Sequence, residues 1–354
     1  MRVEELTFTR FVAAISIVVF HYGLDSVPFN FSSLKPFFTQ ANIGVSYFFV
    51  LSGYVMILAY GDSKGLCFYR YIVNRFSRIY PMYFIAILVL VPFLIVKNYY
   101  FNIPTFDFAG LFLNVFLLQS WVPGKALSIN PPGWSLSVEM FFYLMFPYLL
   151  NRVLPKTKVG HLSLIILLIW LVTQMSIQIL LNTGQFGAFP SKSHDLIFYF
   201  PLMHLNEFLI GALAGIYFKK YFIKKKNTDA IIIAVIILLA IVLWLGSCVN
   251  LQNGILAPFF VVILLLLSIN NGFISTVFRN KLLVLLGETS YCIYILQRPI
   301  FAWGNGFFEH IGVAADQEVR FYSLLLTLMV VSVLSFHFIE TPLRNKIKVL
   351  FSYN

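Results

Sequence analysis

The stretch Phe8–Gly23, FTRFVAAISIVVFHYG, determines how the rest of the chain is interpreted. It is a membrane-type run that Arg10 interrupts near its start and His21 near its end. On an α-helix these two side chains lie within about 20° of each other and roughly 16 Å apart along the axis. A cation and an imidazole on one helix face are costly in hydrocarbon. Either both reach the membrane interfaces as anchors, or both face the interior of a bundle and do chemistry there.

Composition identifies an integral membrane protein. The chain has 354 residues, of which 60% are hydrophobic and only 11% charged, and its mean hydropathy is +0.85. Soluble domains carry about 25% charged residues. Apolar runs long enough to cross a bilayer recur along nearly the whole length and leave no room for a sizeable soluble domain. We therefore predict one all-α domain over residues 1–354, a polytopic helical bundle. The continuous runs argue against a barrel, which requires short alternating segments.

Ten crossings and one shorter apolar piece account for the pattern. The piece at 109–121 is too short to cross and is interpreted as a re-entrant or interfacial segment. An even number of crossings places both termini on one side of the membrane. The predicted crossings are 8–24, 42–60, 79–96, 134–151, 161–182, 197–218, 229–249, 254–270, 282–303 and 320–341.

The positive charges orient this bundle. Of the 25 Lys and Arg residues, only six fall in the loops on the side away from the termini: Lys35, Lys97, Lys125, Lys192, Arg298 and Arg320. This bias predicts cytoplasmic termini in the inner (plasma) membrane. The net charge of +11 is then a topology signal beside anionic lipid, and we expect no nucleic-acid partner. Cys67, Cys248 and Cys292 are too far apart to suggest a disulfide framework or a metal site.

Two basic or small-residue stretches are candidates for a ligand site. The second crossing carries Ser52 and Gly53, small residues that allow close helix approach. The cytoplasmic stretch 68–81, FYRYIVNRFSRIYP, places Arg75 and Arg78 on one helix face, with Pro81 expected to begin the next helix. Two guanidinium groups at a membrane boundary suit a phosphate-bearing ligand. Positive-inside anchoring is the alternative for the same arginines.

A third candidate stretch is 130–143, NPPGWSLSVEMFFY. Trp134 begins a predicted helix at the outer face, and Glu139 follows roughly 7 Å deeper. A carboxylate at that depth must be paired or protonated. Because the predicted topology puts His21 at a similar depth, we expect His21 to be the partner of Glu139. Structural roles are favoured for the other intramembrane ionisable residues: His204, Glu207, Glu288, His337 and Glu340.

Taken together, these segments resemble the acyltransferase-3 family of membrane acyltransferases. The resemblance rests on Arg10 and His21, the runs GVSYFFVLSGY, NRFSRIYP, WSLSVEMFFY and SYCIYIL, and the closing IETP, and it covers essentially the full chain in the family's order. It implies transfer of an acyl group, commonly acetyl, from cytoplasmic acyl-CoA to a hydroxyl of an extracytoplasmic glycan. Acyl-CoA would be a co-substrate, with no permanently bound cofactor and no metal.

The resemblance also implies roles for individual residues. His21 matches the family's essential histidine, Arg10 its basic partner, and Arg75 and Arg78 the arginine pair associated with the donor. Trp134 and Glu139 lie in the WSLxxE motif. We expect Trp134 to bind the donor together with Arg75 and Arg78, and Glu139 to act in catalysis with His21 and Arg10. One departure concerns the acceptor: many members carry a histidine where this chain has Gln297 and Arg298. No soluble domain follows the last crossing, so acceptor selection is expected from the bundle or from a partner.

Two chemical routes remain open on the sequence. His21 acts either as general base on the acceptor hydroxyl, with Glu139 orienting the ring, or as a nucleophile that carries the acyl group. A transporter or flippase for a lipid-linked sugar or another anionic substrate is the alternative from another class, in which Arg10, His21 and Glu139 form a proton relay and substrate clamp. A scaffold in a glycan-assembly complex is a third reading. The acyl group, the acceptor and the oligomeric state are not determined by the sequence.

Overall fold

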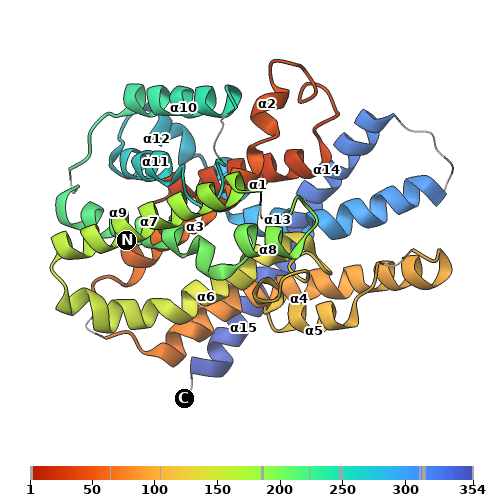
Figure 1. Cartoon of the computed structure of the whole chain (residues 1–354), viewed down its shortest axis with the longest axis horizontal. Helices are drawn as coiled ribbons and strands as arrows, with labels where there is room; N and C mark the ends of the chain where they lie inside the picture. The colour runs from red at the N-terminus through yellow and green to blue at the C-terminus, as the bar shows by residue number, and fades with distance from the viewer. Residues whose placement is uncertain are drawn as a thin grey trace.

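A computed structural model describes residues 3–352 except 64, 104, 185–186, 223, 247–249, 311 and 313–315, so Cys248 lies outside the described residues. Every regular element in the described part is helical, with an isolated bridge between Lys226 and Asn270 (Figure 1). The longer helices are α1 Glu5–Tyr22, α3 Gly44–Tyr60, α4 Phe68–Tyr100, α6 Trp134–Tyr148, α7 Val159–Asn182, α9 Leu205–Tyr221, α10 Asp229–Trp244, α11 Ala257–Ile269, α13 Lys281–His310, α14 Gln317–Ser335 and α15 Thr341–Ser352. The shorter ones are α2 Lys35–Phe38, α5 Phe108–Val115, α8 Lys192–Phe198 and α12 Phe273–Phe278.

Each of the ten predicted crossings overlaps one of these longer helices. Six helical segments in the described chain are long and apolar enough to cross a membrane: Glu5–Tyr22, Lys35–Tyr60, Phe68–Tyr100, Val159–Asn182, Lys192–Tyr221 and Gln317–Phe351. Helices α10 and α11 are apolar but shorter. The all-helical class is thus confirmed, while the count of ten crossings and the side of the termini stay predictions. The piece predicted to be re-entrant forms α5, whose 8 residues extend only about 12 Å.

Helix α4 differs from the prediction at Pro81. Pro81 was expected to begin a helix, but α4 starts at Phe68 and runs through both Pro81 and Pro92 over 33 residues. Prolines are tolerated in membrane helices where neighbouring groups satisfy the disturbed backbone. Here α13 supplies a donor near each: the Tyr291 hydroxyl donates to the Ile79 carbonyl, and the Trp303 indole donates to the Val89 carbonyl. Arg75 and Arg78 therefore belong to the same rigid helix as its apolar part.

Two further boundaries correct the predicted spans. The crossing predicted at 197–218 lies within the candidate span Lys192–Tyr221, but it is not one continuous α-helix. Helix α8 ends at Phe198, Pro201 cannot donate a helical hydrogen bond, and α9 begins at Leu205 after a 3-10 turn at Pro201–His204. The tail after Glu340, expected as a cytoplasmic extension, continues from α14 through one π-turn at Phe336–Glu340 into the helix α15.

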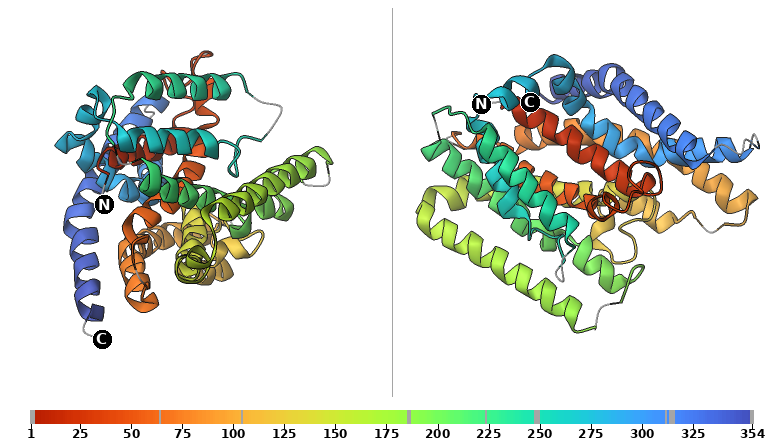
Figure 2. Two further views of the ribbon diagram at one scale, coloured as in Figure 1. Left: turned by 90° about the vertical axis from the view of Figure 1, so that its left-hand side faces the viewer. Right: turned by 90° about the horizontal axis from the view of Figure 1, so that it is seen from above.

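Helix α1 lies inside the bundle, between α3, α11 and α13 (Figure 2). Glycines allow α13 to pack closely against α1, and α9 closely against α3. A Cβ at Gly287 of α13 would collide with the backbone of Thr7 in α1, and a Cβ at Gly211 of α9 would collide with the backbone of Val50 in α3. Small residues of this kind let membrane helices approach until their backbones touch. Gly53, predicted as a packing residue, does the same against the Phe208 backbone.

Candidate active site

The helices α1, α3, α4, α6, α13 and α15 together enclose a cavity of about 550 Å³. Val3, near the start of the chain, and Lys348, near its end, both line it. Its lining is rich in charge. The cations are Arg10, Arg75, Arg78, Arg344 and Lys348, and the carboxylates are Glu139, Glu288 and Glu340.

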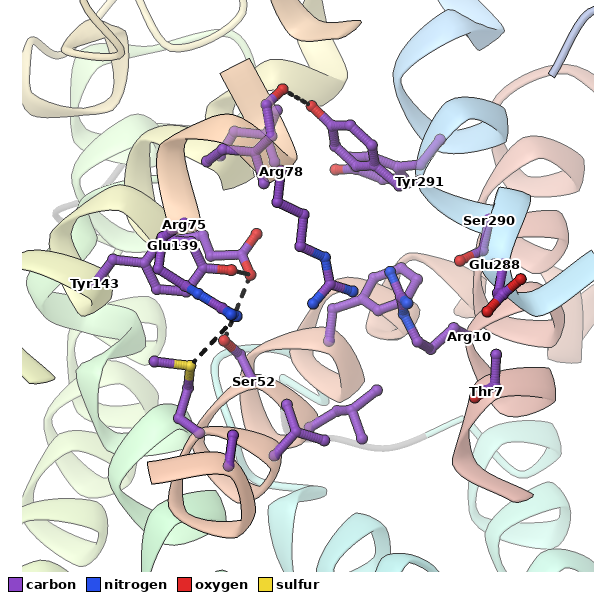
Figure 3. Close-up of a pocket in the computed structure, with 18 of the residues that line it drawn as sticks. Thr7, Arg10, Ser52, Arg75, Arg78, Glu139, Tyr143, Glu288, Ser290 and Tyr291 are labelled. Carbon is purple, nitrogen blue, oxygen red and sulfur yellow. Dashed lines mark hydrogen bonds between the residues drawn. The ribbon is translucent and has the colours of Figure 1, made fainter. Parts of the chain in front are cut away.

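Two arginines extend into the cavity from opposite walls. Figure 3 shows the guanidinium groups of Arg10, on α1, and Arg78, on α4, pointing toward each other. Neither is hydrogen-bonded or salt-bridged to any residue that the structure describes, and Arg10 experiences repulsion from Arg78 alongside attraction from Glu139 and Glu340. A guanidinium group removed from water needs an anionic or hydrogen-bonding partner. Both side chains are half-buried, so the pair is well placed for an anionic ligand.

Arg75 is held differently. Its Nη2 donates to the Tyr60 hydroxyl at 3.0 Å and its Nη1 lies 3.7 Å from the Met56 sulfur. The guanidinium also lies over the rings of Tyr60 and Tyr143, 5.5 and 5.9 Å from their centroids. Its Nε is buried and has no partner among the described residues. These contacts leave Arg75 oriented toward the cavity with a donor unsatisfied.

Glu139 lies in the same part of the cavity. The Tyr143 hydroxyl, one turn along α6, donates to its Oε1, and the Ser52 hydroxyl of α3 lies 3.4 Å from the same oxygen (Figure 3). The prediction that Glu139 is buried at a site is therefore consistent with the geometry. Its predicted partner was wrong: the side chain points toward Arg75 and the wall of α3, and His21 is hydrogen-bonded elsewhere.

His21 lies at the far end of α1, exposed, and is not among the residues that line the cavity. Its Nδ1 is 2.9 Å from Oε1 of Gln297. Because an amide oxygen only accepts, this contact requires the proton on Nδ1 and leaves Nε2 with a free lone pair in the neutral ring. The ring nitrogen available for chemistry is thus fixed by Gln297.

A chain of hydrogen bonds joins the cavity to His21. Tyr294 lines the cavity, and its hydroxyl is bonded to the Ser135 hydroxyl and to the Pro132 carbonyl. One turn further along α13, Gln297 Nε2 donates to the Tyr294 carbonyl at 2.7 Å while its Oε1 accepts from His21. Gln297 therefore links the wall of the cavity to the imidazole, a role that the sequence did not suggest.

Trp134 is not placed with the arginines that it was predicted to join. Its ring packs among Phe49, Tyr199 and His204, with centroids 5.0 to 5.9 Å away. His204 is buried there and bonded to Glu207 Oε2 at 2.7 Å and to the Phe198 carbonyl at 2.9 Å. His204 and Glu207 are thus paired behind the cavity wall, while Glu207 Oε1 has no hydrogen-bond partner among the described residues.

The sequence reading missed part of the cavity lining. Arg344 and Lys348 were treated as tail residues, and Glu288 and Glu340 as structural ones, yet all four line the cavity. The four-residue spacing of Arg344 and Lys348, which puts both on one face of a helix, was the available signal. No group of three or more His, Cys, Asp or Glu side chains in the described chain could hold a metal ion.

The fold and the cavity define a class: a helical membrane protein with a cation-lined cavity joined by hydrogen bonds to an exposed histidine. The comparison with known proteins gives the family. The chain belongs to the acyltransferase-3 family, whose acyltransferase domain matches residues 3–338.

Curated relatives are similar to the chain at low identity. One is acyltransferase MdmB of Streptomyces mycarofaciens, 26% identical over 331 residues that cover 86% of this chain and 80% of the relative. Another is O-acetyltransferase OatA of Staphylococcus aureus strain NCTC 8325, 22% identical over 375 residues that cover 95% of this chain and 56% of the relative. The chain thus spans little more than half the length of the Staphylococcus relative. No solved structure matches it.

Proposed function

We propose that this protein is a membrane O-acetyltransferase of the plasma membrane. In this proposal it takes an acyl group, most simply acetyl, from cytoplasmic acyl-CoA and passes it to a hydroxyl of an extracytoplasmic glycan. The observation that carries the proposal is the cavity in which Arg10 and Arg78 face each other, neither of them hydrogen-bonded or salt-bridged to a described residue, in a chain of an acyltransferase family. Names of relatives support the acyl group, since one is called an O-acetyltransferase.

The donor is proposed to enter on the side of the cavity that α15 lines with Lys348. Its phosphates would be held by Arg75 and Arg78, and Arg10 would contact it deeper in the cavity. The pantetheine arm would then extend past Ser135 and Tyr294 toward His21. The roughly 16 Å between Arg10 and His21 along α1 separates the phosphate end of the donor from its thioester. That separation is why one helix carries both residues.

The proposed chemistry uses the Nε2 lone pair that Gln297 leaves free. Nε2 takes the proton of the acceptor hydroxyl as its oxygen attacks the thioester carbonyl. The C–S bond breaks, and the leaving thiolate of coenzyme A receives the proton back from the imidazolium. The proton is thus returned and His21 ends the cycle unchanged. In the alternative route Nε2 attacks the thioester carbonyl, the C–S bond breaks and coenzyme A leaves as the thiolate. The acceptor hydroxyl then attacks the acyl-imidazole, the C–N bond breaks, and the hydroxyl proton passes to the thiolate, which restores the neutral imidazole.

Glu139 is hydrogen-bonded to Tyr143 and contacts Ser52, whereas His21 contacts Gln297. We therefore do not propose that Glu139 orients the imidazole. Gln297 is the group that contacts the ring, and Glu139 lies among the arginines of the cavity. There it balances part of their charge, and its proposed role is to hold the cavity for the donor. A general base supported by a neutral amide forms imidazolium less readily than one beside a carboxylate, but the ring orientation is the same.

The test is transfer of labelled acetyl from acetyl-CoA to surface glycan in membranes that contain the wild-type chain. We expect His21→Ala to lower transfer by about two orders of magnitude or more while acetyl-CoA still binds. Arg75→Ala combined with Arg78→Ala should instead raise the acetyl-CoA concentration needed for half-maximal transfer. If the His21→Ala variant still transfers acetyl, His21 is not catalytic. If the double variant needs no more acetyl-CoA than the wild type for half-maximal transfer, Arg75 and Arg78 do not bind the phosphates.

A transporter of an anionic lipid-linked sugar is the remaining alternative from another class. The cation-lined cavity would suit such a substrate as well. The same membranes separate the two functions. A transporter moves labelled substrate across the membrane without acetyl-CoA, whereas the enzyme yields an acetylated product only when acetyl-CoA is supplied.

A further inference from the structure

The C-terminal helix α15 forms part of the cavity wall. It packs beside α4, and the ribbon views show the two helices adjacent (Figures 1 and 2). Arg344, Asn345 and Lys348 of α15 line the cavity together with Asn74, Arg75 and Arg78 of α4. Two helices from distant parts of the sequence thus bring four cations and two amides to one side of the cavity.

Among the described residues that line the cavity, five cations face three carboxylates, so the positive charge is only partly balanced. Lys348 is within electrostatic reach of Arg344, Arg75 and Arg78. Arg344 Nη1 is 3.6 Å from Glu340 Oε1, and the charge of Glu340 also attracts Arg78. Like charges four residues apart on a helix are destabilising, and here two further arginines face them. An arrangement of this kind is stabilised when a polyanion occupies it.

The order of the charges along the helix suggests how a polyanion would lie. Glu340, Arg344 and Lys348 follow one another at successive turns, about 6 Å apart. Lys348 is the last of the three along α15, and Arg10 extends into the cavity from α1, facing Arg78 of α4. A ligand whose charge is concentrated at one end would therefore place that end against α15 and α4 and its neutral remainder deeper in the cavity.

We infer that Arg344 and Lys348 of α15 bind the phosphorylated nucleotide end of the acyl-CoA donor, an inference that rests on the proposed function. A phosphomonoester alone carries about −1.5 to −2 charge at neutral pH, and the nucleotide of coenzyme A adds a pyrophosphate to it. Arg75 and Arg78 cannot neutralise this charge by themselves. The two cations of α15 complete the site and make it selective for a donor that carries the nucleotide.

The inference is tested with two donors that share the thioester. Acetyl-CoA carries the nucleotide, and S-acetyl-pantetheine does not. We expect Lys348→Gln to raise the KM for acetyl-CoA about tenfold, the loss of roughly one charge-assisted hydrogen bond. The KM for S-acetyl-pantetheine and kcat with either donor should not change. Ionic strength is held constant, because exposed cations are screened by salt.

Lys346 offers a matched control. It is on the same helix, two residues before Lys348, but is exposed and does not line the cavity. Lys346→Gln should leave the KM for both donors as in the wild type, and Lys348→Arg should keep most of the affinity for acetyl-CoA. Equal changes of KM for both donors in Lys348→Gln would show a structural effect and overturn the inference, as would no change for either.

A binding measurement keeps this inference separate from the proposed function. The thermal midpoint of the purified full chain is followed with free coenzyme A and with pantetheine. The wild type should be stabilised more by coenzyme A, and Arg344→Gln with Lys348→Gln should remove that difference. Should the wild type bind coenzyme A through α15 but transfer no acetyl group, the proposed function fails and the inference stands. Should transfer occur with no loss of binding in the double variant, the inference fails.

Discussion

Nδ1 of His21 lies 2.9 Å from Oε1 of Gln297, at the opposite end of α1 from the arginine-lined cavity. The amide of Gln297 is itself fixed, because its Nε2 donates to the Tyr294 carbonyl and its side chain is fully buried. A buried amide held at both ends cannot rotate freely. It therefore determines both the tautomer and the orientation of the exposed imidazole.

The first prediction concerns this contact. Gln297→Leu keeps the approximate volume but removes the acceptor, so His21 loses its orientation. We expect kcat for acetyl transfer to fall about tenfold, the equivalent of one hydrogen bond, with an unchanged KM for acetyl-CoA. Gln297→Glu retains an oxygen that accepts from Nδ1 and should keep more activity than Gln297→Leu. A Leu variant as active as the wild type would show that the contact does not position His21.

The sequence predicted the donor side of the site better than the acceptor side. Arg75 and Arg78 are three residues apart on one helix, and local periodicity alone puts both in the cavity. Arg10 joins them because a charged residue in a central helix must face the interior. The expected contact between Glu139 and His21 failed for a physical reason. Two span boundaries estimate the depth of each residue, but they do not determine how each helix is rotated about its axis.

Two other features depend on contacts distant in sequence. Helix α15 looks like a charged cytoplasmic tail, and only its packing against α4 turns Arg344 and Lys348 toward the cavity. Pro81 looks like a helix start, but α4 continues through it, and Tyr291 of α13 donates to the nearby Ile79 carbonyl. Neither of these helix–helix contacts can be inferred from local sequence patterns.

The second prediction concerns Glu139. In Glu139→Gln the amide still bonds to Ser52 or Tyr143, but the cavity loses the negative charge that faces Arg10, Arg75 and Arg78. We expect the unliganded variant to be less stable by about 2 kcal/mol. Coenzyme A should raise its thermal midpoint more than it raises that of the wild type, because the ligand's phosphates replace the missing charge. Equal ligand-induced shifts in the two proteins would contradict this account of Glu139.

The third prediction tests the contact between α3 and α9. A side chain at Gly211 would collide with the Val50 backbone, so Gly211→Val must separate the two helices. We expect a loss of about 3 kcal/mol or more, seen as a low yield of folded protein in detergent. Gly160, in the first turn of α7, is the control. A Cβ there meets nothing within 4 Å, so Gly160→Ala should be neutral or slightly stabilising. Similar yields for both variants would contradict the close packing.

The last prediction concerns pH and the loop before α5. Asp107 Oδ2 is 2.6 Å from Lys125 Nζ, and each side chain is about one third exposed, at 32% and 33%. Burial raises the pKa of Asp107, but the hydrogen bond and charge of Lys125 outweigh it, so the pKa is lower than usual. A carboxylate with a lowered pKa in the folded state stabilises the fold above its unfolded pKa, about 3.9. That contribution is lost as the pH falls through the folded value.

Asp107→Asn should therefore lower the thermal midpoint at pH 6, by an amount equivalent to no more than about 1 kcal/mol for a pair this exposed. The difference in thermal midpoint between the variant and the wild type should begin to shrink as the pH falls below about 3.9, and it should disappear as the pH falls through the lower folded pKa of Asp107, where the carboxyl becomes protonated and no longer attracts Lys125. Lys125→Gln should give the same pattern, since it removes the other half of the pair. A difference that stays constant as the pH falls through the folded pKa of Asp107 would mean that Asp107 acts through its shape in the loop and not through its charge.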